Sequence, residues 1–283
     1  MRRLKILHRT YYNFRSLVQL QPHRLLLRPR EGPGLRIEVS SLDISPPAQI
    51  RWHRDANDNS VAMATFASPT SQLAIISECI VQQFDERPLD FLVADFAVNY
   101  PFNYDTDSAE VLQPYLHCAP QSDSGMLAGW MRQYWRPGEP VQTYQLLDRL
   151  CAGIHRSLTY QMREQPGVQS GIETLTRGIG SCRDFANLFI EGARTLGLAT
   201  RFVSGYLNAP RSDGSSGSTH AWAEVYLPGA GWKGFDPTSG EIAGARHIAV
   251  AVARQPEIVS PVTGAFVGPS RAELTVGVWV SEL

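Results

Sequence analysis

The sequence predicts an α+β protein, in which a β-sandwich-like domain precedes a domain of helices and antiparallel strands. Three observations support this prediction. Short stretches of alternating apolar and polar residues, separated by turn residues, fill about the first hundred positions. Apolar residues then recur with helical spacing, and alternation returns towards the C-terminus. We therefore expect a β-rich N-terminal domain at residues 1–110 and a second domain at residues 111–283, which includes a C-terminal strand extension.

The N-terminal half has the pattern of several short strands. The expected strands cover residues 4–12, 35–39, 50–52, 61–63 and 73–84. The stretch Asp55–Asn59 consists of turn-forming residues and separates two of these strands. Regularly spaced strands with turns between them are typical of a sandwich.

Two amphipathic helices are expected near the start of the second half. Their apolar faces consist of Leu127, Trp130, Met131 and Tyr134 in the first helix and of Leu146, Leu147, Leu150 and Ile154 in the second. Apolar stripes of this kind usually face a protein core, so we assign neither helix a function. The polar stretch 211–218 is expected to form a flexible loop, and residues 274–280 alternate as a closing strand.

The composition excludes several classes of protein. Hydrophobic residues make up 43% of the chain and charged residues 19%, which argues against a mainly disordered protein. The net charge of -1 argues against nucleic acid as a partner. No apolar run reaches the length of a signal peptide or a membrane span, so we expect a cytoplasmic protein without a membrane partner. The cysteines, which form no CxxC pair and predict no disulfide scaffold, are Cys79, Cys118, Cys151 and Cys182.

One helix is predicted to carry a cysteine at its start. Ser181 and Asp184 have the spacing of a capping box, with aspartate in place of the usual glutamate. Apolar residues then recur with helical spacing as far as Gly197, which is a suitable C-terminal stop. A helix is therefore expected to begin at Ser181 or Cys182.

A cysteine in the first turn of a helix has the setting of a nucleophile. The unpaired N–H groups and the positive end of the helix dipole stabilise a thiolate at Cys182. The same N–H groups can bind a developing oxyanion, and Gly178 and Gly180 allow a substrate to approach the backbone closely. A buried structural cysteine is the alternative, and this segment alone favours neither interpretation.

A hairpin further along the chain is predicted to bring a histidine and an aspartate together. Two alternating stretches flank the turn residues Pro228–Gly231, with His220 at the start of the first stretch and Asp236 at the end of the second. If the turn centres near its first two residues, His220 and Asp236 lie opposite each other to within one register step and share a face. Asp236 would then orient the imidazole, whose other nitrogen would face Cys182.

A metal site is the alternative explanation for these three side chains. Cys182, His220 and Asp236 are all competent zinc ligands. The sequence contains no CxxC or HxxxH pattern, and no second histidine lies near His220 along the chain. We therefore expect neither a metal nor a cofactor.

Four blocks of the sequence, in this order, resemble the core of the bacterial transglutaminase-like superfamily. They are Gly180–Ala186, Arg201–Tyr206, His220–Tyr226 and Gly231–Thr238. The resemblance implies that Cys182, His220 and Asp236 form a catalytic triad. It also implies a papain-like fold, in which the nucleophile helix packs on an antiparallel sheet that carries the other two residues, and it makes residues 111–283 the catalytic domain.

The resemblance extends to the N-terminal half and has one departure. Residues 11–14, 23–30 and 55–59 resemble the β-rich N-terminal domain of many such bacterial proteins. Relatives often carry a GRDY-like block after a histidine-isoleucine pair that matches His247–Ile248. Here residues 251–256 read Ala-Val-Ala-Arg-Gln-Pro, so no role of that block is carried over.

The residues and the resemblance together predict thiol-based acyl transfer or hydrolysis at a peptide or glutamine carboxamide. Cys182 is expected to attack the carbonyl, His220 to act as base and then as acid, and Asp236 to orient His220. The Cys182 N–H is expected to supply one oxyanion donor. The Tyr160 side chain is a candidate for a second donor, with a purely structural tyrosine as the alternative.

Three functions stay open on the sequence. Water as the acceptor makes the protein a cysteine protease or amidase, which we favour, acting on a protein or peptide substrate. A primary amine as the acceptor makes it a protein cross-linking transglutaminase. A non-catalytic protein-binding module is the alternative of another class.

Overall fold

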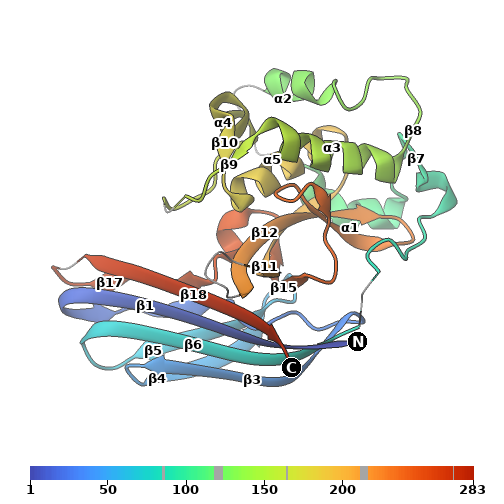
Figure 1. The fold of residues 1–283 in the computed structure, drawn as a ribbon. Coiled ribbons are helices and arrows are strands. Elements are labelled where there is room, and N and C mark those ends of the chain that lie inside the picture. The colour runs from blue at the N-terminus through green and yellow to red at the C-terminus, as the bar shows by residue number, and fades with distance from the viewer. Residues whose placement is uncertain (85–86, 118–123, 164, 211–215, 270) are drawn as a thin grey trace.

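The computed structural model describes residues 1–84, 87–117, 124–163, 165–210, 216–269 and 271–283. Within these residues the chain forms five α-helices and mostly antiparallel sheets, which confirms the predicted fold class. Figure 1 shows a layered body of strands, which includes β1 and β18, beside a second body in which helices cover a smaller sheet. Among the described residues, no helix has the length and hydropathy needed to cross a membrane.

The N-terminal half is a sandwich of two antiparallel sheets. The larger sheet has the order β17 (Phe266–Val267), β1 (Arg2–Leu20), β6 (Thr70–Gln83) and β3 (Leu35–Ser45), and β18 (Ala272–Glu282) also pairs with β1. The smaller sheet has the order β16 (Val262–Thr263), β2 (His23–Leu25), β5 (Ser60–Phe66) and β4 (Ala48–Arg54). Apolar side chains of both sheets meet in one core, as the alternating sequence requires; they include Val18, Leu25, Ala62 and Leu73.

The turn predicted between β4 and β5 is present and has a second task. The Asp55 carboxylate accepts hydrogen bonds from the N–H groups of Asn57 and Asn59, both at 2.9 Å, which closes the turn. Buried Asn59 exchanges two side-chain hydrogen bonds of 2.8 Å with the backbone of Val252 in the second half. The turn therefore joins the sandwich to the other sheet.

The second half is built on a five-stranded antiparallel sheet. Its order is β14 (Glu241–Ile242), β13 (Gly231–Asp236), β12 (Ser216–Leu227), β11 (Thr200–Pro210) and β15 (His247–Ala253). The helices are α1 (Thr106–Leu116), α2 (Ser124–Met131), α3 (Thr143–Ser157), α4 (Gly171–Arg177) and α5 (Cys182–Thr195). Helix α5 packs on β12 and β11, and its Phe189 stacks on Phe235 of β13 with ring centroids 5.5 Å apart. The remaining short elements are β7 (Asn99–Tyr100), β8 (Val141–Gln142), β9 (Thr159–Tyr160), β10 (Ile179–Gly180) and the 3-10 turns Asp95–Ala97 and Pro256–Val259.

The C-terminal segment returns to the N-terminal sheets. β18 pairs antiparallel with β1 from Leu4↔Glu282 to Phe14↔Ala272, and β16 and β17 pair with β2 and β1. The segment expected as a strand extension of the second domain thus completes the sandwich. The expected division at residue 110 falls inside α1.

Two further expectations differ from the structure. Tyr134 lies beyond the end of α2, so the predicted helical face stops at Met131. Of the expected loop 211–218, residues 211–215 lie outside the described residues, and residues 216–218 begin β12. There the chain extends because Ser218 pairs with Leu207 of β11.

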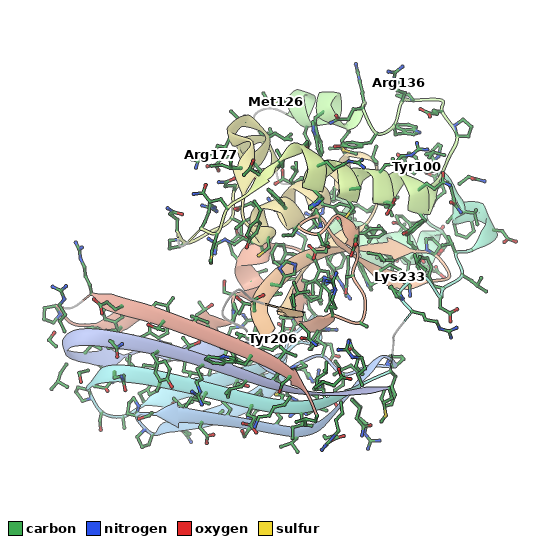
Figure 2. All side chains as sticks on the ribbon, in the orientation of Figure 1. Tyr100, Met126, Arg136, Arg177, Tyr206 and Lys233 are labelled. Atoms are coloured by element: carbon green, nitrogen blue, oxygen red, sulfur yellow. The ribbon has the colours of Figure 1, made fainter. Side chains whose placement is uncertain are left out.

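Buried Tyr206 lies where the two halves meet (Figure 2). Its hydroxyl donates to the Leu27 carbonyl at 3.0 Å and lies 3.0 Å from Nδ1 of His8 on β1. Because that hydroxyl gives its proton to Leu27, His8 Nδ1–H donates to Tyr206, and the Thr10 hydroxyl donates to Nε2 at 3.1 Å. Burial lowers the pKa of His8 to about 4, so the ring is a neutral link between the halves at pH 7.

Candidate active site

Cys182 is the first residue of α5, as the capping pattern predicts. Ser181 is the N-cap, and the capping box with Asp184 is present. Gly197 lies just after the helix with φ of 73°, a left-handed conformation that favours glycine at a helix end. The predicted start and stop of this helix are therefore confirmed.

Asp184 does more than cap the helix, because its fully buried carboxylate accepts five hydrogen bonds. Two come from the Ser181 N–H at 2.8 Å and the Ser181 hydroxyl at 2.7 Å. Arg163 donates two more, at 2.7 and 2.8 Å, and the Gln169 N–H donates the fifth at 2.8 Å. Burial raises the pKa of Asp184, but the bonds from Arg163, Gln169 and Ser181 outweigh burial and lower it. This ionised carboxylate ties the segment before α4 to the start of α5.

The hairpin of β12 and β13 brings His220 to Asp236. His220 Nε2 lies 2.8 Å from Asp236 Oδ2, and both side chains are buried. Leu227 pairs with Gly231 across a three-residue turn, and this register places Asp236 opposite Trp222. The two side chains are therefore diagonal neighbours on one face, because Asp236 lies opposite the residue two positions after His220. They share a face, as predicted, but do not oppose each other directly.

His220 and Cys182 line one cavity of about 240 Å³. Burial lowers the pKa of His220, but interactions with Asp236 and Cys182 outweigh burial and raise it to about 10. The ring is therefore protonated at pH 7. Since Nε2 is bound to Asp236, Nδ1 is the nitrogen left for the Cys182 thiol.

His247 completes this cluster, and the sequence analysis missed it. Its Nε2 lies 3.1 Å from Asp236 Oδ2, and its ring centroid is 5.9 Å from that of His220. No second histidine lies near His220 along the chain, but His247 lies near it in space. β15 returns beside β11, which is a long-range pairing that residue spacing does not reveal. The available signal was the His247–Ile248 pair of the family pattern.

Asp236 is fixed through both carboxylate oxygens. Oδ2 faces the two histidines, and Oδ1 accepts the Thr238 N–H at 2.9 Å. Burial raises the pKa of Asp236, but the bonds from His220 and His247 outweigh burial and hold it well below its usual range. The side chain is thus an ionised acceptor at any pH near neutral.

The same three residues form the one group among the described residues that could hold a metal ion. Donor atoms of His220, Asp236 and His247 lie within 4.8 Å of one another. Each of these atoms already takes part in the hydrogen bonds described above. Those bonds explain the cluster without a metal, and Cys182 does not belong to it.

Tyr160 lies beside the cysteine helix. β9 pairs in parallel with β10, which places Tyr160 next to Gly180, two residues before Cys182. The phenol ring is half-exposed and meets Phe185 edge-on at 6.4 Å. Burial raises the pKa of Tyr160, and so do the nearby Cys182 and Asp236. The phenol is therefore neutral and able to donate a hydrogen bond at pH 7.

Comparisons with known proteins agree on one family. Residues 4–82 match the model for the bacterial transglutaminase-like N-terminal region, and residues 136–237 match that for the transglutaminase-like superfamily. An uncharacterised protein of Mycobacterium tuberculosis, Rv2569c, is 30% identical over 93% of this chain and 87% of its own length. ML0607 of Mycobacterium leprae is 25% identical over the full length of both proteins.

A solved structure shares the whole fold. A Cytophaga hutchinsonii protein, provisionally named a cysteine protease, superposes with a TM-score of 0.75 at 18% sequence identity. The match covers 100% of this chain and 91% of that protein, so the sandwich and the helix-covered sheet recur together. From the sandwich, the cysteine helix on its antiparallel sheet and these matches, we conclude that the chain belongs to the bacterial transglutaminase-like family.

Proposed function

We propose that this protein is a cysteine hydrolase that cleaves a peptide bond or a glutamine carboxamide through a thioester on Cys182. The observation that carries the proposal is the position of His220, which contacts Asp236 and lines one cavity with Cys182. Membership of the transglutaminase-like family supports the general class of chemistry. A carbonyl carbon placed between Cys182 and His220 would meet a nucleophile and a proton donor together.

The proposed reaction has two steps. The Cys182 thiolate attacks the carbonyl carbon and forms the C–S bond, and the C–N bond breaks as His220 gives its proton to the leaving amine or ammonia. A water molecule then attacks the thioester, gives a proton to His220 and displaces the Cys182 thiolate. Asp236 keeps His220 oriented and stabilises its charged form in both steps.

Two donors are proposed for the oxyanion. The Cys182 N–H is among the first N–H groups of α5, which have no acceptor within the helix. The Tyr160 hydroxyl is the second proposed donor, because its strand pairing holds it beside the cysteine. Removal of one oxyanion donor typically costs on the order of a hundredfold in rate, so Tyr160→Phe should slow the reaction without abolishing it.

Water is the proposed acceptor because the cavity is partly polar. Ser204 and Thr219 line it near His220, and exposed Glu257 lines it as well. We propose a protein or peptide substrate, and a cytoplasmic location in which Cys79, Cys151 and Cys182 stay free thiols.

To test the proposal, the protein is incubated with a library of glutamine-containing peptides, with and without a primary amine, and the products are analysed by mass spectrometry. Hydrolysis or deamidation that is lost in Cys182→Ser is the expected result. Amine incorporation in place of water would assign the cross-linking transglutaminase instead. An absence of either product, together with peptide binding equal in wild type and Cys182→Ser, would leave the non-catalytic binding module.

A further inference from the structure

His247 shares a carboxylate oxygen with His220, and no step of the proposed reaction uses it. Its Nε2 lies 3.1 Å from Asp236 Oδ2, the atom that His220 approaches at 2.8 Å. We propose that His247 is a positioning residue, which holds the Asp236 carboxylate in the orientation that binds His220. This inference rests on the proposed function, because it assigns His247 a task within the same site.

The hydrogen bonds define the protonation of His247. The Gly244 N–H donates to His247 Nδ1 at 3.2 Å, so that nitrogen carries no proton. The proton is then on Nε2, which donates to Asp236. Through this nitrogen His247 donates to the same carboxylate oxygen that His220 approaches.

Asp236 needs such a donor because of its place in the sheet. It is the last residue of β13, and its carboxylate reaches diagonally to His220. Thr238 N–H binds Oδ1 at 2.9 Å, which leaves Oδ2 to be fixed by the histidines. Without His247, the Thr238 bond to Oδ1 and the single bond between His220 and Oδ2 would remain to orient the carboxylate.

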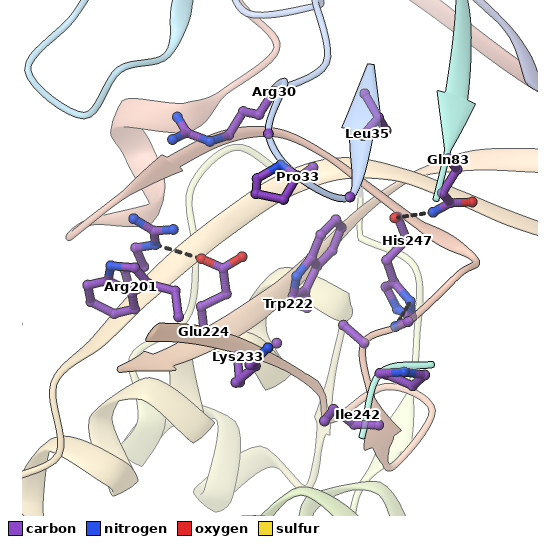
Figure 3. Close-up of a pocket in the computed structure, with 18 of the residues that line it drawn as sticks. Arg30, Pro33, Leu35, Gln83, Arg201, Trp222, Glu224, Lys233, Ile242 and His247 are labelled. Carbon is purple, nitrogen blue, oxygen red and sulfur yellow. Dashed lines mark hydrogen bonds and ion pairs between the residues drawn. The ribbon is translucent and has the colours of Figure 1, made fainter. Parts of the chain in front are cut away.

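The position of His247 is itself set by several contacts. Its backbone pairs with Leu207 of β11, and its N–H donates to the Gly244 carbonyl at 2.8 Å. Its ring meets Trp222 edge-on at 5.0 Å. Figure 3 shows the Gln83 side chain from β6 reaching the His247 carbonyl, at 3.4 Å, beside a cavity of about 380 Å³. His247 thus connects the sandwich to the carboxylate.

Other titratable groups near Asp236 do not replace this contact. Cys182 on α5, Cys151 on α3 and Tyr160 on β9 each have an interaction with Asp236 or with His220. Glu241 pairs with Asp236 across β13 and β14, but its carboxylate binds Arg246 at 3.2 Å. Among the described side chains, the two histidines are the ones that hydrogen-bond the Asp236 carboxylate.

The test compares His247→Leu, His247→Asn and His247→Gln with wild type. NMR titration gives the pKa of His220, and intact mass gives the rate of Cys182 alkylation by iodoacetamide. Glutamine places an N–H where His247 Nε2 lies, whereas leucine has no donor and asparagine is too short. His53→Leu, on the exposed part of β4, is the control.

Lower pKa values of His220 are expected in His247→Leu and His247→Asn, by at least about one unit, which corresponds to a tenfold change in proton affinity. Alkylation at pH 7 should slow by a similar factor. His247→Gln should restore both values, and His53→Leu should change neither. Folded His247→Asn or His247→Leu with an unchanged pKa of His220 would overturn the inference.

The two proposals fail in different ways. If His247→Asn lowers the pKa of His220 but wild type turns over no peptide, the positioning role stands and the proposed function is wrong. If wild type turns over peptide and His247→Asn acts at the same rate with the same pH profile, the function stands and the positioning role is wrong.

Discussion

The charge of His220 depends on two neighbours acting against burial. Desolvation alone would leave this ring neutral at pH 7, but the Asp236 carboxylate and the Cys182 side chain stabilise the imidazolium. The sequence predicted the partner because both residues fall on the same face of one hairpin. It could not predict how tightly the carboxylate is held, since His247 arrives from a strand that is distant along the chain.

Stability should depend on pH through this ring. The folded pKa of His220 is about 10, above its ordinary value of 6.5, so the folded state binds the proton more tightly. The stabilisation is complete below pH 6.5 and is lost as the pH rises through about 10. Denaturant unfolding of wild type and His220→Gln at several pH values measures this stabilisation. The difference between their unfolding free energies should shrink by on the order of several kcal/mol across this range. A constant difference would contradict the assignment.

The elements of the site were predictable to the extent that their patterns are local. The capping box gave the start of α5, and alternation gave β12 and β13. The pattern of Ser181 and Asp184 did not reveal the bonds from Arg163 and Gln169, because these depend on how the segment before α4 folds back. The diagonal placement of His220 and Asp236 was also not predicted, because it depends on the exact number of residues in the turn.

Loss of Asp184 should therefore damage more than a helix cap. Asp184→Ala leaves buried donors without an acceptor, and breaking a buried ion pair typically costs about 3–5 kcal/mol. Chemical denaturation should show an effect of this size together with slower alkylation of Cys182. Glu173→Ala, which breaks the exposed i,i+4 pair with Arg177 on α4, is the matched control. It should change the unfolding free energy by less than about 0.5 kcal/mol. Equal effects of the two substitutions would contradict the account.

Across the whole molecule, the sandwich and the second half share one core. Apolar residues of β1 and β6, such as Ile6 and Val81, belong to the same buried cluster as Ile248 of β15 and Val280 of β18. The sequence indicated a two-part chain, because each half has its own periodicity. It did not indicate the return of β18 to β1 or the bonds through Asn59 and Tyr206, which join residues more than a hundred positions apart.

A single cooperative unfolding transition is expected from this shared core. Tyr206→Phe should leave the unfolding transition cooperative. It should lower the free energy of unfolding by about 1–3 kcal/mol, because His8 and the Leu27 carbonyl lose the buried hydroxyl that they bind. Far-UV and near-UV circular dichroism in urea measure both properties. Two separate transitions in wild type would contradict the shared core, and an unchanged midpoint in Tyr206→Phe would contradict the hydroxyl's role.

The central claim is that Cys182 is a nucleophile activated by His220. The most direct measurement is the rate of iodoacetamide alkylation at each cysteine, followed by peptide mass spectrometry across pH in wild type and His220→Ala. Fast, pH-dependent labelling of Cys182, slowed by about tenfold or more in His220→Ala, is the predicted result. Equally slow labelling of all cysteines, unaffected by the substitution, would contradict it.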